Sequence, residues 1–140
     1  MRLFSQDAKV GALSRAPLFE GLSKKDLREL ARLTEDLEMP AGTVLCKEGS
    51  LGYEFFVIVE GEVDVRQKGK HIGTRGPGDF VGEIALIENV RRTATVTAKT
   101  PLRFFVLTRQ SFWGLVDHHP QVERKILTTL ARRLLRDGEA

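Results

Sequence analysis

The sequence predicts a mainly β protein in which an antiparallel β-barrel lies between two groups of helices. The middle of the chain, 37–107, consists of short β-prone runs interrupted by glycines, which is typical of closely spaced strands. Apolar residues at helical spacing occur before this part, in 7–36, and after it, in 109–136. Since 140 residues is the size of one average domain, we expect a single domain over 1–140.

Two helices are expected in the N-terminal part. Residues 7–13 are a weak candidate. A stronger one begins at Ser23-Lys-Lys-Asp26, which resembles a capping box with Asp in place of Glu. Its apolar face would consist of Leu27, Leu30, Ala31 and Leu33.

Five short runs are the clearest strand candidates. They are 43–46, 55–59, 62–66, 93–98 and 102–107, with glycine-containing turns at 40–42, 48–49, 60–61, 68–69 and 76–78. His71 lies beside one of these turns, so we expect it in a solvated loop. No helix-length segment separates the strands, which favours a sandwich or barrel over βαβ units.

The C-terminal part is expected to form two helices. Thr108 can cap a segment that carries Phe112 and Trp113, and Pro120 can begin a longer helix. The apolar residues of that longer helix form one stripe: Val122, Ile126, Leu127, Leu130, Ala131, Leu134 and Leu135. The stripe either packs on the barrel, which the small number of heptads favours, or pairs with a second copy, so we expect a monomer or a weak homodimer.

Composition excludes several classes of protein. The net charge of +3 comes from 22 basic and 19 acidic residues that are interspersed, so it does not indicate nucleic-acid binding. Cys46 is the only cysteine, which excludes an intrachain disulfide. No apolar run approaches the length of a membrane span or a signal peptide, so we expect a cytoplasmic protein. The adjacent His118 and His119 would point in different directions from a helix end, so we expect no metal site.

Residues 76–96 carry the chemistry that is most informative. Gly82 lets the backbone approach a ligand, and 84–87 can form one helical turn whose free N–H groups attract an anion. Arg92 then supplies a planar guanidinium that suits two phosphate oxygens. Because Glu83 would repel a phosphate, its expected role is to accept a hydrogen bond from a hydroxyl. A ligand with a phosphate and a neighbouring sugar hydroxyl satisfies both residues.

This segment has a family resemblance. Phe80-Val-Gly-Glu-Ile-Ala-Leu-Ile87 followed by Arg92-Thr-Ala-Thr-Val96 resembles the phosphate-binding cassette of cyclic nucleotide-binding domains. These domains occur in regulatory subunits of cAMP-dependent kinase, in cGMP-dependent kinase, in cyclic-nucleotide-gated channels and in the bacterial cAMP receptor protein. The resemblance covers 15–135 and includes 17–23, 40–44, 47–49 and 56–63, the last of which looks like the family's central hairpin. It implies a double-stranded β-helix, or jelly roll, with a C-terminal helical lid.

The resemblance also implies roles for individual residues. Arg92 would contact the cyclic phosphate, Glu83 would accept the ribose 2′-hydroxyl, and Thr93 would lie near the phosphate or base. Backbone amides of Ile84 and Ala85 would complete the phosphate cradle, and Val65 would line the base pocket. The expected ligand-binding set is Val65, Val81, Gly82, Glu83, Ile84, Ala85, Arg92, Thr93 and Ala94. Val81 stands where an aromatic residue is common and Arg75 where leucine is, which leaves the base preference open; we favour cAMP over cGMP.

The expected function is that of a sensor in which nucleotide binding reorients the C-terminal helix and acts on an unknown protein effector. A cGMP-selective domain, or a fragment of a larger cAMP-regulated transcription factor, kinase or channel, is the alternative. A third possibility is that Glu83 and Arg92 form only a structural ion pair. No set of catalytic residues, metal cluster or cofactor motif is visible in the sequence, so we expect neither an enzyme nor a cofactor. No contact with a membrane or nucleic acid is expected.

Overall fold

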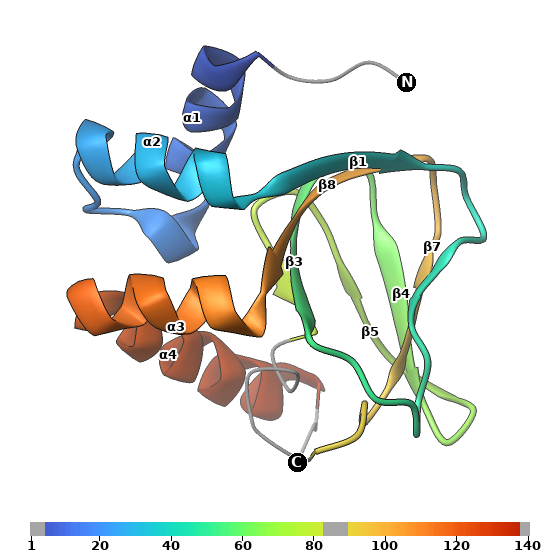
Figure 1. The fold of residues 1–140 in the computed structure, drawn as a ribbon. Coiled ribbons are helices and arrows are strands. Elements are labelled where there is room, and N and C mark those ends of the chain that lie inside the picture. Colours follow the sequence, from blue (N-terminus) through green and yellow to red (C-terminus); the bar gives the residue numbers. More distant parts are fainter. Residues whose placement is uncertain (1–4, 83–89, 138–140) are drawn as a thin grey trace.

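A computed structural model describes residues 5–82 and 90–137 of the chain. The helices are α1 (Gln6–Ser14), the 3-10 helix η1 (Pro17–Phe19), α2 (Lys24–Leu33), α3 (Arg109–His118) and α4 (Pro120–Asp137). The strands are β1 (Glu35–Met39), β2 (Val44–Cys46), β3 (Glu54–Glu60), β4 (Val63–Gln67), β5 (Lys70–Arg75), β6 (Phe80–Val81), β7 (Thr95–Ala98) and β8 (Leu102–Thr108). The expected order of helices, strands and helices is confirmed (Figure 1).

The strands form two four-stranded antiparallel sheets. One has the order β1-β8-β3-β6 and the other the order β2-β7-β4-β5. In the first, Phe56 of β3 lies opposite Val106 of β8; in the second, Val65 of β4 lies opposite Val96 of β7. The expected mainly β fold of jelly-roll type with flanking helices is therefore confirmed. Within the described residues no strand pairing joins the two sheets, so they form an open roll and not a barrel.

The expected central hairpin over 56–63 is also wrong, because β3 and β4 belong to different sheets. The chain changes sheets at Gly61, which has a φ of 92°. A Cβ at this position would overlap with the carbonyl oxygen of Pro101 and would lie 2.8 Å from Oγ1 of Thr100. Glycine therefore allows a tight crossing where a paired turn was expected.

Sequence reasoning missed three strands. β1 begins at Glu35, inside the part assigned to helices, and β5 contains His71, which was expected in a loop. All three missed strands, β1, β5 and β6, lie at the edge of a sheet. Edge strands need no continuous apolar run, since one side of the strand is unpaired and polar residues are tolerated there, so the pattern that revealed β3 and β8 is weak in them.

The core consists of two apolar clusters on opposite faces of the β1-β8-β3-β6 sheet. Phe55 and Phe105 pack toward the helices with Leu30, Phe112 and Val122. The alternate residues Phe56, Ile58, Phe104 and Val106 pack between the two sheets with Val63, Val65 and Val96. Figure 1 shows this sheet between the helices and the β4, β5 and β7 strands. Burial of both faces explains why β3 and β8 are almost entirely apolar.

The helix starts follow the sequence signals. Ser23 precedes α2, and its hydroxyl oxygen accepts a hydrogen bond from the Asp26 amide at 3.1 Å. Thr108 caps α3 in the same way through the Ser111 amide, at 3.2 Å. Pro120 is the first residue of α4, where its missing N–H costs nothing. Buried residues of α3 and α4 pack in the same apolar cluster as Phe55 and Phe105, so both helices lie against the β1-β8-β3-β6 sheet.

Candidate functional site

Arg92 is held by the loop between β2 and β3. Its amide donates to the carbonyl oxygen of Ser50 at 2.8 Å, and its carbonyl oxygen accepts from the amide of Gly49 at 2.8 Å. The side chain of the neighbouring Arg91 donates to the carbonyl oxygen of Gly49 at 3.0 Å. These bonds fix the backbone of Arg92 just before β7 begins, so the direction of its side chain is set by tertiary contacts.

The guanidinium of Arg92 is largely shielded from solvent, with 7% of the residue exposed. Its Nη1 donates to the carbonyl oxygen of Gly82 at 3.2 Å, and its Cζ lies 5.8 Å from the centre of the Phe56 ring. Across residues 5–82 and 90–137, no carboxylate lies within ion-pair distance of this guanidinium. A shielded cation that still has N–H donors to spare attracts an anion more strongly than an exposed one.

Two glycines make room for this arginine. A Cβ at Gly52 would overlap with Nε of Arg92 and would lie 2.5 Å from its Cζ. A Cβ at Gly82, whose φ is 83°, would lie 2.9 Å from Nη1 of Arg92 and 3.0 Å from the carbonyl oxygen of Glu54. In the described residues, the close approach that Gly82 permits is therefore to Arg92 and to the backbone of β3.

Three of the other expected site residues that the structure describes belong to the apolar cluster between the sheets. Val81 and Val65 are buried in the cluster between the sheets, and Ala94 is partly buried against it. Thr93 is exposed. Glu83, Ile84 and Ala85, with the expected helical turn over 84–87, lie outside the described residues. The structure thus brings Val81, Gly82 and Arg92 to one end of the roll.

The loop residues that hold Arg92 were missed by sequence reasoning. The turn at Gly49 was expected, but nothing in the sequence connected Gly49, Ser50 or Gly52 with an arginine about forty positions later. The one usable signal was the pair of glycines three positions apart in a short loop, which indicates close backbone approach without saying to what.

Arg75 lies at the end of β5 opposite Val63. Only 2% of this arginine is exposed, although leucine is common at this position in the family that the sequence resembles. The structure therefore holds a charged side chain inside the protein at this position.

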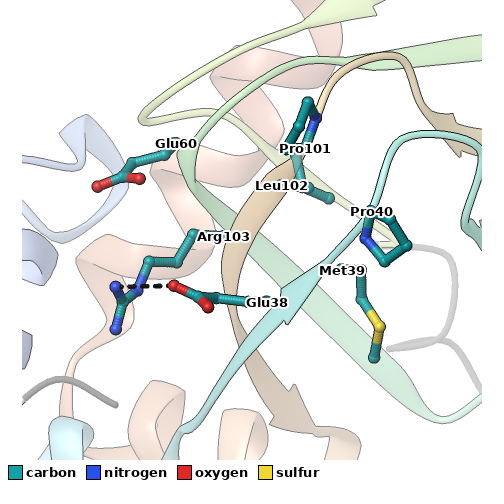
Figure 2. Close-up of a pocket in the computed structure, with 7 residues that line it drawn as sticks. All are labelled: Glu38, Met39, Pro40, Glu60, Pro101, Leu102 and Arg103. Carbon is teal, nitrogen blue, oxygen red and sulfur yellow. Dashed lines mark hydrogen bonds and ion pairs between the residues drawn. The ribbon is translucent and has the colours of Figure 1, made fainter. Parts of the chain in front are cut away.

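A third buried arginine, Arg103, lines a hollow elsewhere and differs from Arg92 in its charge balance. Arg103 is 2% exposed; its Nη2 and Nε donate to Asp36 at 2.9 and 3.3 Å, and its Nη1 donates to Glu38 at 3.1 Å. Figure 2 shows the Arg103 and Glu38 side chains directed toward each other. The hydrogen bond to Asp36 raises the pKa of the Arg103 guanidinium. Because the carboxylates of Asp36 and Glu38 already balance the charge of Arg103, we expect it to attract a further anion less strongly than Arg92 does.

The histidines do not form a metal site in the part of the chain that the structure describes. His119 Nε2 lies 3.5 Å from Asp26, and His118 Nδ1 lies 3.1 Å from the carbonyl oxygen of Gly114. No group of three or more His, Cys, Asp or Glu side chains there is arranged to hold a metal ion. No helix among the same residues is both long and apolar enough to cross a bilayer.

The two-sheet roll therefore carries a buried arginine, Arg92, that has no carboxylate partner among the described residues. A model of the cyclic nucleotide-binding domain matches residues 36–119, which is 84 of the 140 residues. The chain therefore belongs to the cyclic nucleotide-binding domain family.

Similar proteins place this domain in several kinds of regulator. The cyclic nucleotide-gated potassium channel RHE_CH03180 of Rhizobium etli is 36% identical over 121 residues, covering 86% of this chain and 34% of the channel. A cAMP-dependent protein kinase regulatory subunit of Yarrowia lipolytica is 33% identical over 108 residues, covering 76% and 29%. The solved structure of cAMP-bound PfPKA-R has the same fold, with a TM-score of 0.83, 24% identity, and coverage of 96% of this chain and 48% of that one. The chain spans about a third of the length of the curated relatives.

Proposed function

We propose that this domain binds cAMP in preference to cGMP, with Arg92 as the principal phosphate ligand. The observation that carries the proposal is that Arg92 is 7% exposed and has no carboxylate partner within the described residues. A cyclic phosphate carries one negative charge and two exocyclic oxygens, which match the fork of a guanidinium. The preference for cAMP is supported by relatives such as the cAMP-dependent kinase regulatory subunit.

We assign the remaining contacts from the resemblance of residues 80–96 to the phosphate-binding cassette of the family. Glu83 would accept a hydrogen bond from the ribose 2′-hydroxyl, and the amides of Ile84 and Ala85 would donate to the phosphate. Thr93 is exposed beside Arg92, so its hydroxyl is available to the phosphate or the base. Val65, Val81 and Ala94 belong to the cluster between the sheets, and we assign the apolar wall of the base pocket to them.

The output of the domain would be a movement of α4. Leu127 and Leu135 of this helix are 60% and 88% exposed, so apolar surface is available to cover a base. Ligand occupancy would shift the population toward a state in which that surface is buried. We assign no catalysis to the domain, and the partner that reads the position of α4 is a protein effector.

The effector need not be a separate chain. The relatives are about three times as long as this domain and include a channel and a kinase regulatory subunit, so the domain can serve as the sensing part of such a protein. A cytoplasmic location stays a prediction, supported by a sequence with only one cysteine, Cys46, which cannot form an intrachain disulfide. A cGMP-selective domain is the second candidate, since Thr93 is exposed and its hydroxyl would be available to a guanine edge.

Calorimetric titration of the purified chain with cAMP, cGMP and 5′-AMP tests the proposal. We expect saturable 1:1 binding of cAMP, weaker binding of cGMP, and little binding of 5′-AMP because its open phosphate has a different charge and shape. If cGMP bound more tightly than cAMP, cGMP would be the preferred ligand and the proposed preference would be wrong. Absence of heat with both cyclic nucleotides would contradict the proposed function.

A further inference from the structure

The first turn of α4 is anchored in the helical core. Val122 is fully buried and belongs to the same apolar cluster as Leu18 and Phe19 of η1. Only His119 separates α4 from α3. The beginning of α4 is therefore held against the N-terminal helices, which lie about a hundred positions earlier in the chain.

Lys125 adds a polar contact one turn further along the helix. Its ammonium Nζ donates to the carbonyl oxygen of Pro17 at 3.3 Å and also to the carbonyl oxygen of Glu20. These oxygens lie at η1 and its C-terminal end, where backbone carbonyls attract a positive charge. We call this pair of hydrogen bonds the Lys125 contact.

Beyond the Lys125 contact, α4 leaves apolar side chains in solvent. Leu130 is partly buried against the helical cluster, but Leu127 is 60% exposed and Leu135 is 88% exposed. The helix is thus anchored at its start and exposes leucines along the rest of its length. A rotation about its anchored end would be enough to bury them elsewhere.

We propose that the Lys125 contact holds α4 in this open position and thereby lowers the apparent affinity for the nucleotide. The inference rests on the proposed function, in which α4 moves when the ligand binds. A ligand that selects the moved state has to compete with two charge-assisted hydrogen bonds that exist only in the open state. Removing these bonds leaves a larger fraction of the protein ready to bind.

The test compares three variants of the full chain. Lys125→Met keeps the length and apolar stem of the side chain but removes the ammonium donor. Arg124→Met is the matched control, because it removes a positive charge from the exposed side of the same helix. Lys125→Arg keeps both the charge and N–H donors. Each is measured by calorimetry with cAMP and by hydrogen exchange of α4 amides without nucleotide.

For Lys125→Met we expect the affinity for cAMP to be about three- to tenfold higher, because the open state loses one or two partly exposed hydrogen bonds. We also expect faster hydrogen exchange of the α4 amides. Arg124→Met and Lys125→Arg should stay within twofold of the wild type in both measurements. Unchanged exchange and affinity in Lys125→Met would overturn the proposal. Faster exchange with lower affinity would also overturn it, because the bound state would then retain the contact.

The two measurements separate this inference from the function on which it rests. If the wild type binds neither cyclic nucleotide, the proposed function fails and so does the effect on affinity. Hydrogen exchange without nucleotide still decides whether the Lys125 contact restrains α4.

Discussion

Replacing Arg92 by alanine should weaken cAMP binding without displacing the backbone at position 92. The substitution removes the guanidinium whose Nη1 bonds to the Gly82 carbonyl oxygen at 3.2 Å and leaves the backbone bonds to Gly49 and Ser50 in place. The other N–H donors of the fork are the ones that we assign to the phosphate. The variant therefore separates ligand binding from the position of the loop.

The size of the effect follows from the number of charged hydrogen bonds lost. A hydrogen bond to a charged group contributes about 1.5–3 kcal/mol, and water can replace part of it at a pocket entrance. We expect a loss of about 2–4 kcal/mol in binding, which is about thirtyfold to several hundredfold in affinity. The fold loses the Arg92 hydrogen bond to the Gly82 carbonyl oxygen at 3.2 Å, which contributes about 1.5–3 kcal/mol. It also loses a cation–π contact to Phe56 at 5.8 Å, which contributes about 0.5–1 kcal/mol.

Calorimetric titration with cAMP measures the first quantity, and urea unfolding without ligand measures the second. Arg91→Ala is the matched control, because Arg91 is an exposed neighbour that bonds to the Gly49 carbonyl oxygen at 3.0 Å; its affinity should stay within threefold of the wild type. A change below threefold for Arg92→Ala would mean that the phosphate is held elsewhere. Equal losses in the two variants would show that the loop, and not the Arg92 guanidinium, determines binding.

Three further changes test the ligand contacts and the fold. Glu83→Gln should weaken cAMP binding less than Arg92→Ala does, and 2′-deoxy-cAMP should bind the wild type and this variant alike; an equal loss for both nucleotides would remove Glu83 from the hydroxyl role. Arg103→Met should lower the free energy of unfolding in urea by about 3–5 kcal/mol, because the buried Asp36 carboxylate loses its charged neighbour, and the double change with Asp36→Leu should recover part of the loss. Ser23→Ala should cost about 0.5–2 kcal/mol of stability as an N-cap substitution. The hydrogen bond from Ser23 lowers the pKa of Asp26, so the stability linked to Asp26 is present above the ordinary carboxyl pKa and is lost as the pH falls through its lower folded value. Urea unfolding should therefore show a smaller Ser23→Ala loss in acid than at pH 7, and a loss that grows in acid would refute this assignment.

The phosphate end of the proposed site could be inferred from the sequence because its chemistry lies in one short segment. Gly82, Glu83 and Arg92 occur within eleven positions, and a glycine, a carboxylate and a guanidinium at this spacing already indicate an anion beside a hydroxyl. The support of Arg92 could not be predicted in the same way. Gly49, Ser50 and Gly52 act through backbone bonds and through the absence of a side chain, and the two glycines do not indicate which distant residue they approach.

The same distinction applies to the fold. The sequence alone was enough to place the helices that begin at Ser23, Thr108 and Pro120, and the buried strands β3 and β8, because caps and continuous apolar runs are local signals. Only the tertiary structure decided that the chain crosses between two sheets at Gly61, that edge strands form at β1, β5 and β6, and that Lys125 meets the carbonyls of η1. These features depend on pairing and contact between distant segments, whose free energy comes from partners that no local pattern contains.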